Sequence, residues 1–193
     1  MALVAAAFAR LRIPEVWVIP AGVPVHRQLS GQAGPARRLA WMQRIFASDS
    51  RVTVIDWEVR QNGPVSSLQT LQWLHASHPG VLPLWLMGAD AFAGLSTWKG
   101  YPEHRRYCNV AVFARAGQAM PGTQGWRECE AEAVAGLQAP GHVARVDTKL
   151  PDISATRLRQ ALASGQIPQG WLPAPIAAEV AAAYRNDRHE EKA

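Results

Sequence analysis

Short apolar segments alternate along this chain with segments of helical periodicity, and that alternation restricts the possible folds more than any other feature. The apolar segments are predicted to be strands and lie at 15–19, 52–55, 82–87, 109–113 and 143–146. The helical segments lie at 2–11, 37–47, 67–75, 154–163 and 175–184. Strands joined by helical crossovers pair in parallel, and the crossovers cover both sheet faces. We therefore predict a doubly wound, mostly parallel α/β sheet in a single domain over residues 1–185, followed by a charged C-terminal tail at 186–193.

Composition and charge narrow the classes of protein. With 193 residues, of which 48% are hydrophobic, the chain is long and apolar enough for one sizeable core, which excludes a disordered protein. The formal net charge of +5 suits anionic ligands, but the basic residues are scattered, so we expect no nucleic-acid partner. Cys108 and Cys129 have no metal-ligand spacing, and no apolar run approaches the roughly 20 residues of a membrane span. We expect a cytoplasmic protein with no membrane partner and no metal site of its own.

The sharpest local pattern lies at the start of the helical segment 154–163. Ser154 stands at the expected N-cap, and Thr156 and Arg159 are three residues apart, so they share one helix face. The free N–H groups of a helix N-terminus, two hydroxyls and a guanidinium together suit a phosphate group. An ordinary capped surface helix explains these residues equally well, so both interpretations stay open.

A second group of candidates follows the third predicted strand. Gly88 would let a ligand approach the backbone closely. Asp90 could accept hydrogen bonds from sugar hydroxyls or cap the next helix, and capping is the more common role. Trp98 could stack on an aromatic or cationic ring. The chain has eight tryptophans, so ordinary packing is the more common role for any one of them.

Two further segments follow predicted strands, at the edge where parallel sheets bind ligands. The loop after the first strand contains His26 and Arg27, which could meet phosphates, although an ordinary polar loop is the simpler explanation. Ser66 and Ser67 open the helix at 67–75 and could cap it, which is the default role, or donate hydrogen bonds to a carboxylate. The usual signatures of hydrolases, zinc proteases, P-loop proteins and dehydrogenases are absent.

Taken together and in order, these segments resemble the nicotinate-mononucleotide adenylyltransferase family of the nucleotidyltransferase superfamily. The resemblance runs along nearly the whole chain. The segments that carry it are 18–27, 38–42, 58–71, 88–90 with Trp98, 112–117, 153–159 and the end of the chain from 172. No single motif is decisive, but so many in the family's order are hard to explain by chance.

The resemblance implies adenylyl transfer from ATP to nicotinate mononucleotide, giving deamido-NAD and pyrophosphate in NAD biosynthesis, with Mg²⁺ as cofactor. It implies in-line attack by the mononucleotide phosphate on the α-phosphorus of ATP, with no covalent enzyme intermediate. The residues that it places against ATP and its phosphates are Ser154, Thr156, Arg159, Gly88, Asp90, Arg27 and His26. The residues that it places against nicotinate mononucleotide are Trp98, Ser67, Ser66 and Arg115.

The sequence departs from the family's pattern at several places, including Gln69, Arg27 in place of Lys and Ala116 in place of the turn proline. Val65, Ser66 and Ser67 stand where the family has Ser-Tyr-Thr, so the amidated mononucleotide stays open as a substrate. The family also opens with a strand, a glycine-rich turn and the histidine pair HxGH, which cradle the ATP phosphates. Residues 1–4 of this chain resemble the family's segment directly after the second histidine, so no catalytic residue is identified.

Two explanations account for the absence of the HxGH segment from the start of this chain. We favour an internal Met1 with the true start upstream; the other is that the short chain is a relative which lost the activity. A strand missing from the middle of the expected order would leave unpaired backbone in the sheet. The alternatives to the leading hypothesis are therefore a related adenylyltransferase for another phosphorylated substrate and an inactive nucleotide-binding protein.

Overall fold

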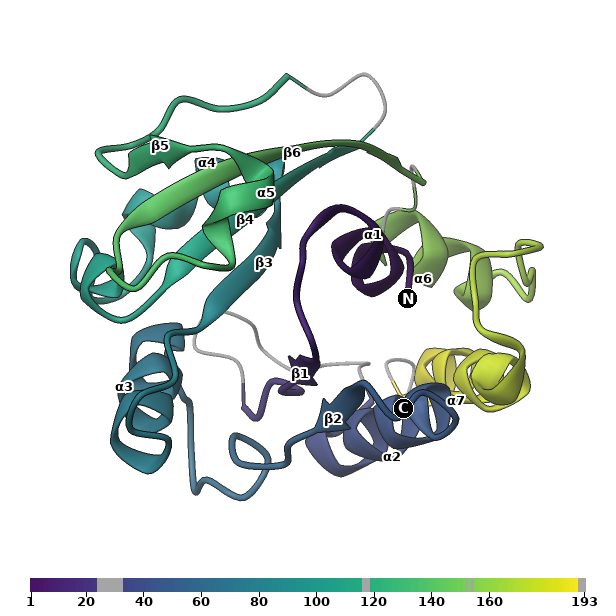
Figure 1. Ribbon diagram of the computed structural model, residues 1–193. Helices are drawn as coiled ribbons and strands as arrows, with labels where there is room; N and C mark the ends of the chain where they lie inside the picture. The colour runs from purple at the N-terminus through teal and green to yellow at the C-terminus, as the bar shows by residue number, and fades with distance from the viewer. Residues whose placement is uncertain (24–32, 116–118, 152, 154, 191–193) are drawn as a thin grey trace. The chain divides into compact units, whose positions relative to one another are not determined.

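The computed structural model describes residues 1–23, 33–115, 119–151, 153 and 155–190 (Figure 1). Its contacts divide the chain into two compact units, each made of two separate stretches. The first unit comprises Met1–Pro14 and Ser66–Asp152, and the second comprises Glu15–Val65 and Ile153–Ala193. The single domain over 1–185 that we expect from the sequence stays a prediction.

A four-stranded parallel sheet forms the centre of the first unit (Figure 1). Its strand order is β3 (Leu84–Gly88), β4 (Asn109–Arg115), β6 (His142–Leu150) and β5 (Arg127–Cys129), and every neighbouring pair is parallel. Parallel pairing brings the carboxyl ends of the strands to one edge of the sheet, which is where such sheets bind ligands.

The core of the first unit lies on both faces of this sheet because β4 is apolar at nearly every position. Residues 110–113 are at most 1% exposed, and successive side chains of a strand point to opposite faces. On one face, α1 (Ala2–Arg10) and α5 (Ala131–Val134) join the same apolar cluster as Phe113, with Ala7 of α1 fully buried. The remaining regular elements of the unit are α3 (Ser67–Ser77), α4 (Ala89–Ala93) and the 3-10 turns η1 (Leu95–Thr97) and η2 (Glu103–Arg106).

The second unit contains a two-stranded parallel sheet and a group of helices. β1 (Val16–Val18) pairs with β2 (Val52–Val54). The helices are α2 (Pro35–Phe46), α6 (Ala155–Ala163), the 3-10 turn η3 (Ala174–Ile176) and α7 (Ala177–Glu190). They share an apolar cluster that includes Trp41 of α2, Leu162 of α6 and Val180 of α7.

All the predicted strands form, and the predicted parallel α/β class is confirmed. The sequence did not predict β5, which has three residues and carries Arg127 and Glu128, so it lacks the apolar alternation of a strand. The last helix, α7, extends to Glu190, into the segment expected as a tail. Among the described residues the strands form two separate hydrogen-bonded sheets, in which β1 and β3 are edge strands.

Candidate active site

The third strand, β3, ends in a close approach between Gly88 and Asp90. Gly88 is the N-cap of α4, with φ −74° and ψ 157°. A Cβ atom on Gly88 would lie 2.7 Å from Oδ1 of Asp90, so any larger residue would have to displace that carboxylate. Asp90 is exposed in the first turn of α4, where the helix dipole favours a negative charge. The N-cap position therefore belongs to Gly88, and the carboxylate of Asp90 stands at the carboxyl end of the strand.

Trp98 belongs to a cluster of aromatic rings beside β3. Its ring centroid lies 5.8 Å from that of Trp85, with an angle of 68° between the planes. Trp85 stacks on His104 at 6.0 Å and 20°, and the ring of Tyr101 lies 6.5 Å from that of His104. Trp98 is only partly buried, so its indole is fixed by packing and still has surface for a ligand.

A reciprocal capping box closes the N-terminus of α3. The hydroxyl of Ser66, the N-cap, accepts a hydrogen bond from the backbone N–H of Gln69 at 3.4 Å. The side-chain oxygen of Gln69 accepts one from the backbone N–H of Ser66 at 2.9 Å. Ser66 is 8% exposed. The structure therefore shows the capping role for Ser66, while its contact with a ligand stays a prediction.

The hydroxyl of Ser67 lies 3.0 Å from Nε2 of His104. His104 is completely buried, and its Nδ1 has no hydrogen-bond partner among the described residues. Burial lowers the pKa of His104, which keeps the ring neutral at pH 7. Ser67 is partly exposed at the first position of α3, so its hydroxyl connects a buried imidazole with the surface.

A glycine allows the loop after Trp98 to approach α3 closely. Gly100 has φ +86°, and a Cβ atom there would lie 2.3 Å from Cδ2 of Leu68. Leu68 follows Ser67 directly, so this approach brings the loop to the first turn of α3. The structure thereby gathers two predicted ligand residues, Trp98 and Ser67, in one region of the first unit.

The sequence analysis did not identify His104, because the charged residues beside it indicate a solvent-exposed segment. It lies in η2, where Glu103, Arg105 and Arg106 are charged, and such a run is typical of an exposed surface. The turn nevertheless buries His104 between β3 and α3, where it contacts Trp85 and Ser67. Nothing in the local pattern distinguishes it from an exposed residue.

In the second unit, α6 carries the residues predicted to bind phosphate. Thr156 and Arg159 share one face as predicted, with the Arg159 guanidinium 3.5 Å from the Thr156 hydroxyl. Thr156 is exposed and Arg159 partly exposed, whereas Leu162 is buried. The polar face of α6 is therefore open to an anion, and the binding of phosphate there stays a prediction.

Arg38 of α2 binds the backbone on both sides of residues 24–32. Its guanidinium donates to the carbonyl oxygens of Ala21 and Ala33 at 2.6 Å and of Gly22 at 2.7 Å. Three donors spread over one planar group suit this task, and a lysine would not reproduce the geometry. Sequence reasoning assigned Arg38 no such role, because the pattern shows only a basic residue near a helix start.

Several predicted ligands lie outside the part of the chain that the structure describes. They are His26, Arg27, Ser154 and the side chain of Arg115, whose backbone ends β4. Their roles stay predictions.

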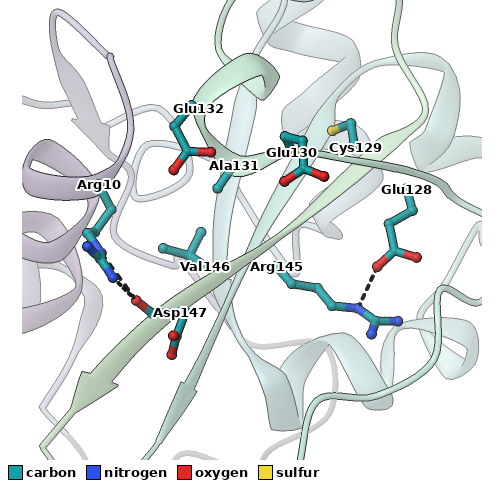
Figure 2. A pocket seen from close by; sticks show the side chains of 9 residues that line it. All are labelled: Arg10, Glu128, Cys129, Glu130, Ala131, Glu132, Arg145, Val146 and Asp147. Atoms are coloured by element: carbon teal, nitrogen blue, oxygen red, sulfur yellow. Dashed lines mark hydrogen bonds and ion pairs between the residues drawn. The ribbon is translucent and has the colours of Figure 1, made fainter.

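A pocket of about 330 Å³ lies beside β6, at the end of β5 (Figure 2). Its lining residues are Arg10, Glu128, Cys129, Glu130, Ala131, Glu132, Arg145, Val146 and Asp147. Arg10 donates to the carbonyl oxygen of Asp147 at 3.1 Å, and Arg145 pairs with Glu128 at 3.1 Å (Figure 2). Four acidic side chains face two guanidinium groups, so the pocket disfavours phosphates and is no candidate for the nucleotide site.

Other kinds of site find little support in the described residues. They contain no group of three or more His, Cys, Asp or Glu side chains that could hold a metal ion. Both cysteines are free, and burial raises the pKa of the Cys108 thiol, which keeps it protonated and inert. Within the same part of the chain, none of the helices has the length and apolarity that crossing a membrane requires.

Curated proteins with clear sequence similarity span nearly the same length. No family model matches the chain. A protein of Chromobacterium violaceum named probable nicotinate-nucleotide adenylyltransferase is 35% identical over 181 residues, which is 90% of this chain and 85% of that protein. A protein of the same name from Neisseria meningitidis is 33% identical over 172 residues, which is 89% of this chain and 84% of that protein.

Two solved structures of the Plasmodium falciparum nicotinic acid mononucleotide adenylyltransferase share the fold. The one complexed with NaAD has a TM-score of 0.65 at 14% identity and covers 91% of this chain and 83% of that chain. The one complexed with APC has a TM-score of 0.66 at 12% identity and covers 97% and 89%. Because the Chromobacterium violaceum protein is 35% identical along most of both chains, the chain belongs to the nicotinate-nucleotide adenylyltransferase family.

Proposed function

We propose that this chain transfers the adenylyl group of ATP to nicotinate mononucleotide, giving deamido-NAD and pyrophosphate in NAD biosynthesis. Membership of the family supports the reaction. The main observation in favour of a pyridine mononucleotide as the substrate is Trp98, a partly exposed indole near the first turn of α3. A cationic pyridine ring stacks on indole, and a carboxylate suits the free N–H groups of a helix N-terminus.

The reaction needs positioning and charge neutralisation more than covalent chemistry. A phosphate oxygen of the mononucleotide bonds to the α-phosphorus of ATP, the bond from that phosphorus to the bridging oxygen breaks, and pyrophosphate leaves with the electron pair. Thr156 and Arg159 would hold phosphates on α6, and the Gly88 backbone would lie against the nucleotide. The other residues assigned to ATP are Ser154, Asp90, His26 and Arg27.

Magnesium fits this reaction as the complex with ATP. In nucleotide sites Mg²⁺ is bound by phosphate oxygens, waters and one or two carboxylates, so a cage of protein ligands is not required. Asp90 is an exposed carboxylate at the end of β3 and is suited to supply one such ligand. When bound, the ion neutralises charge on the phosphates.

Release of pyrophosphate tests the proposal. The purified chain, and a form extended upstream of Met1 by about 20 residues, roughly a strand and a turn, are incubated with ATP, Mg²⁺ and nicotinate mononucleotide. Release that requires both substrates, in either form, supports the proposal. Nucleotide binding without release in both forms would favour an inactive nucleotide-binding protein. Release with a different phosphorylated acceptor alone would favour a related adenylyltransferase.

The role of Trp98 is tested by binding. Trp98→Ala should weaken binding of nicotinate mononucleotide by roughly tenfold or more, because a stacked ring contributes about 1–3 kcal/mol. Trp98→Phe should keep part of the affinity. Trp73→Ala is the matched control, since Trp73 is also partly buried but packs edge-on to His78 on the far part of α3. Equal losses in Trp98→Ala and Trp73→Ala would contradict the stacking role.

A further inference from the structure

The buried contact between His104 and Ser67 has no part in the proposed reaction so far. We propose that His104 is a positioning residue, whose Nε2–H donates to the hydroxyl of Ser67 and so directs the hydroxyl proton outward, toward the carboxylate of the bound mononucleotide. The proposal rests on the proposed function for the identity of that ligand. It adds the residue that sets the direction of one hydrogen bond.

The position of the proton on His104 is determined by the surroundings of its two ring nitrogens. A neutral imidazole carries one N–H, either on Nδ1 or on Nε2. Nδ1 has no partner among the described residues, so a proton there would leave a buried N–H donor unsatisfied. A proton on Nε2 instead donates to the Ser67 oxygen, 3.0 Å away. The second arrangement leaves only an acceptor lone pair unsatisfied, which is the less costly defect.

This tautomer decides what Ser67 presents to a ligand. Its oxygen accepts the bond from His104, so its own O–H is left to donate. The adjacent N–H groups of the first turn of α3 are donors as well, because the first N–H groups of a helix have no partner within it. Ser66 adds no acceptor, since its hydroxyl is engaged in the capping box. The first turn therefore presents mainly donors.

A surface of donors discriminates between the two pyridine mononucleotides. A carboxylate accepts with both oxygens, whereas an amide has one acceptor and an NH₂ group that would face another donor. The charge of the carboxylate strengthens each bond that it accepts. We therefore expect His104, through Ser67, to favour the acid mononucleotide over the amide.

The tautomer can be read without any ligand. Nitrogen-15 NMR of the six histidines, with the His104 signals identified by their loss in His104→Gln, distinguishes protonation at Nδ1 from protonation at Nε2. The proposal requires Nε2–H at pH 7. A proton on Nδ1, or a charged ring at that pH, would overturn it.

Binding of the acid and amide mononucleotides, followed by tryptophan fluorescence, provides the functional test. His104→Leu should lower affinity for the acid by roughly tenfold, the effect of one charge-assisted hydrogen bond, and change affinity for the amide much less. His104→Gln, whose side-chain N–H can replace Nε2–H, should restore most of the preference for the acid. Thermal unfolding of each variant checks that it is folded.

A double-mutant cycle with Ser67→Ala separates positioning from general support. Because His104 acts through the hydroxyl, His104→Leu should have little further effect on acid binding in the Ser67→Ala background. Additive losses, or equal losses for acid and amide, would overturn the role of His104. If the folded wild-type chain binds neither mononucleotide, the proposed function fails as well. If the wild-type chain binds the acid and His104→Leu leaves that binding unchanged, only the role of His104 fails.

Discussion

At Gly100 the loop after Trp98 approaches the Leu68 side chain of α3 closely. The backbone has φ +86°, and a Cβ atom would lie 2.3 Å from Leu68. Contact at this distance requires Leu68 to move, and Leu68 lies in the first turn of α3 beside Ser67. A side chain at position 100 would therefore have to displace the end of the Leu68 side chain and adopt a positive φ as well.

Gly100→Ala should destabilise the fold more than Gly80→Ala. Both glycines have positive φ, +86° and +89°, so both alanines carry the backbone strain of about 1–2 kcal/mol. Only position 100 adds a clash, because nothing lies within 4 Å of a Cβ on Gly80. Urea unfolding of the two variants measures the difference. Equal free energies of unfolding would show that Leu68 adjusts without cost.

His104 should make stability depend on pH in the mildly acidic range. Burial lowers the pKa of the folded ring below the value of about 6.5 that it has in the unfolded chain. Between those two pKa values the unfolded chain binds a proton that the folded chain does not. The free energy of unfolding should therefore fall as the pH drops below about 6.5, until it reaches the folded pKa. The slope should be shallower in His104→Gln, and an unchanged slope would argue against the buried neutral ring.

At the scale of elements, the first turn of α3 combines a cap with a proposed binding role. Ser66→Ala removes the hydroxyl that accepts from the Gln69 N–H and should cost about 1 kcal/mol of stability. Ser66→Gly should cost only about a few tenths of a kcal/mol of stability, because glycine is also tolerated at the N-cap. Thermal unfolding compares the two. A loss in Ser66→Gly as large as in Ser66→Ala would mean that packing of the side chain, and not capping, is what Ser66 contributes.

The elements that the sequence predicted are those with a clear apolar period. β4 is recognisable because residues 110–113 are all apolar and buried on both faces, and α6 because Leu158 and Leu162 recur on one side. β5 was not predicted because two of its three residues are charged and its place is set by pairing with β6. Pairing between distant segments leaves no local pattern.

The candidate site was predictable only in part for a similar reason. Trp98, Gly88 and Ser67 follow strands or open a helix, positions that sequence order alone locates. His104 was not found, because its burial depends on how η2 packs against α3 and β3. Arg38 was not assigned a role either, because its three carbonyl partners carry no side-chain signal.

At the scale of the molecule, position within the sheet should set the rate of backbone hydrogen exchange. Among the described strands, β4 lies between β3 and β6, so its N–H groups have strand partners on both sides, whereas β3 pairs with β4 alone. Alternate N–H groups of β3 therefore have no partner in another described strand. Exchange measured by NMR should be slowest in 110–113 and much faster at alternate positions of 84–88. Uniform protection of β3 equal to that of β4 would contradict this.

Among the described strands β3 lies at one edge of its sheet, and this position affects how the 193-residue chain associates with itself. The other edge strand of the same sheet, β5, carries Arg127 and Glu128, and charge on an edge discourages pairing with another chain. The five residues of β3 include neither a charge nor a proline. Light scattering per unit mass should rise with protein concentration, and more steeply when salt screens the net charge of +5. Self-association of the 193-residue chain would then depend on one short strand and not on its average composition.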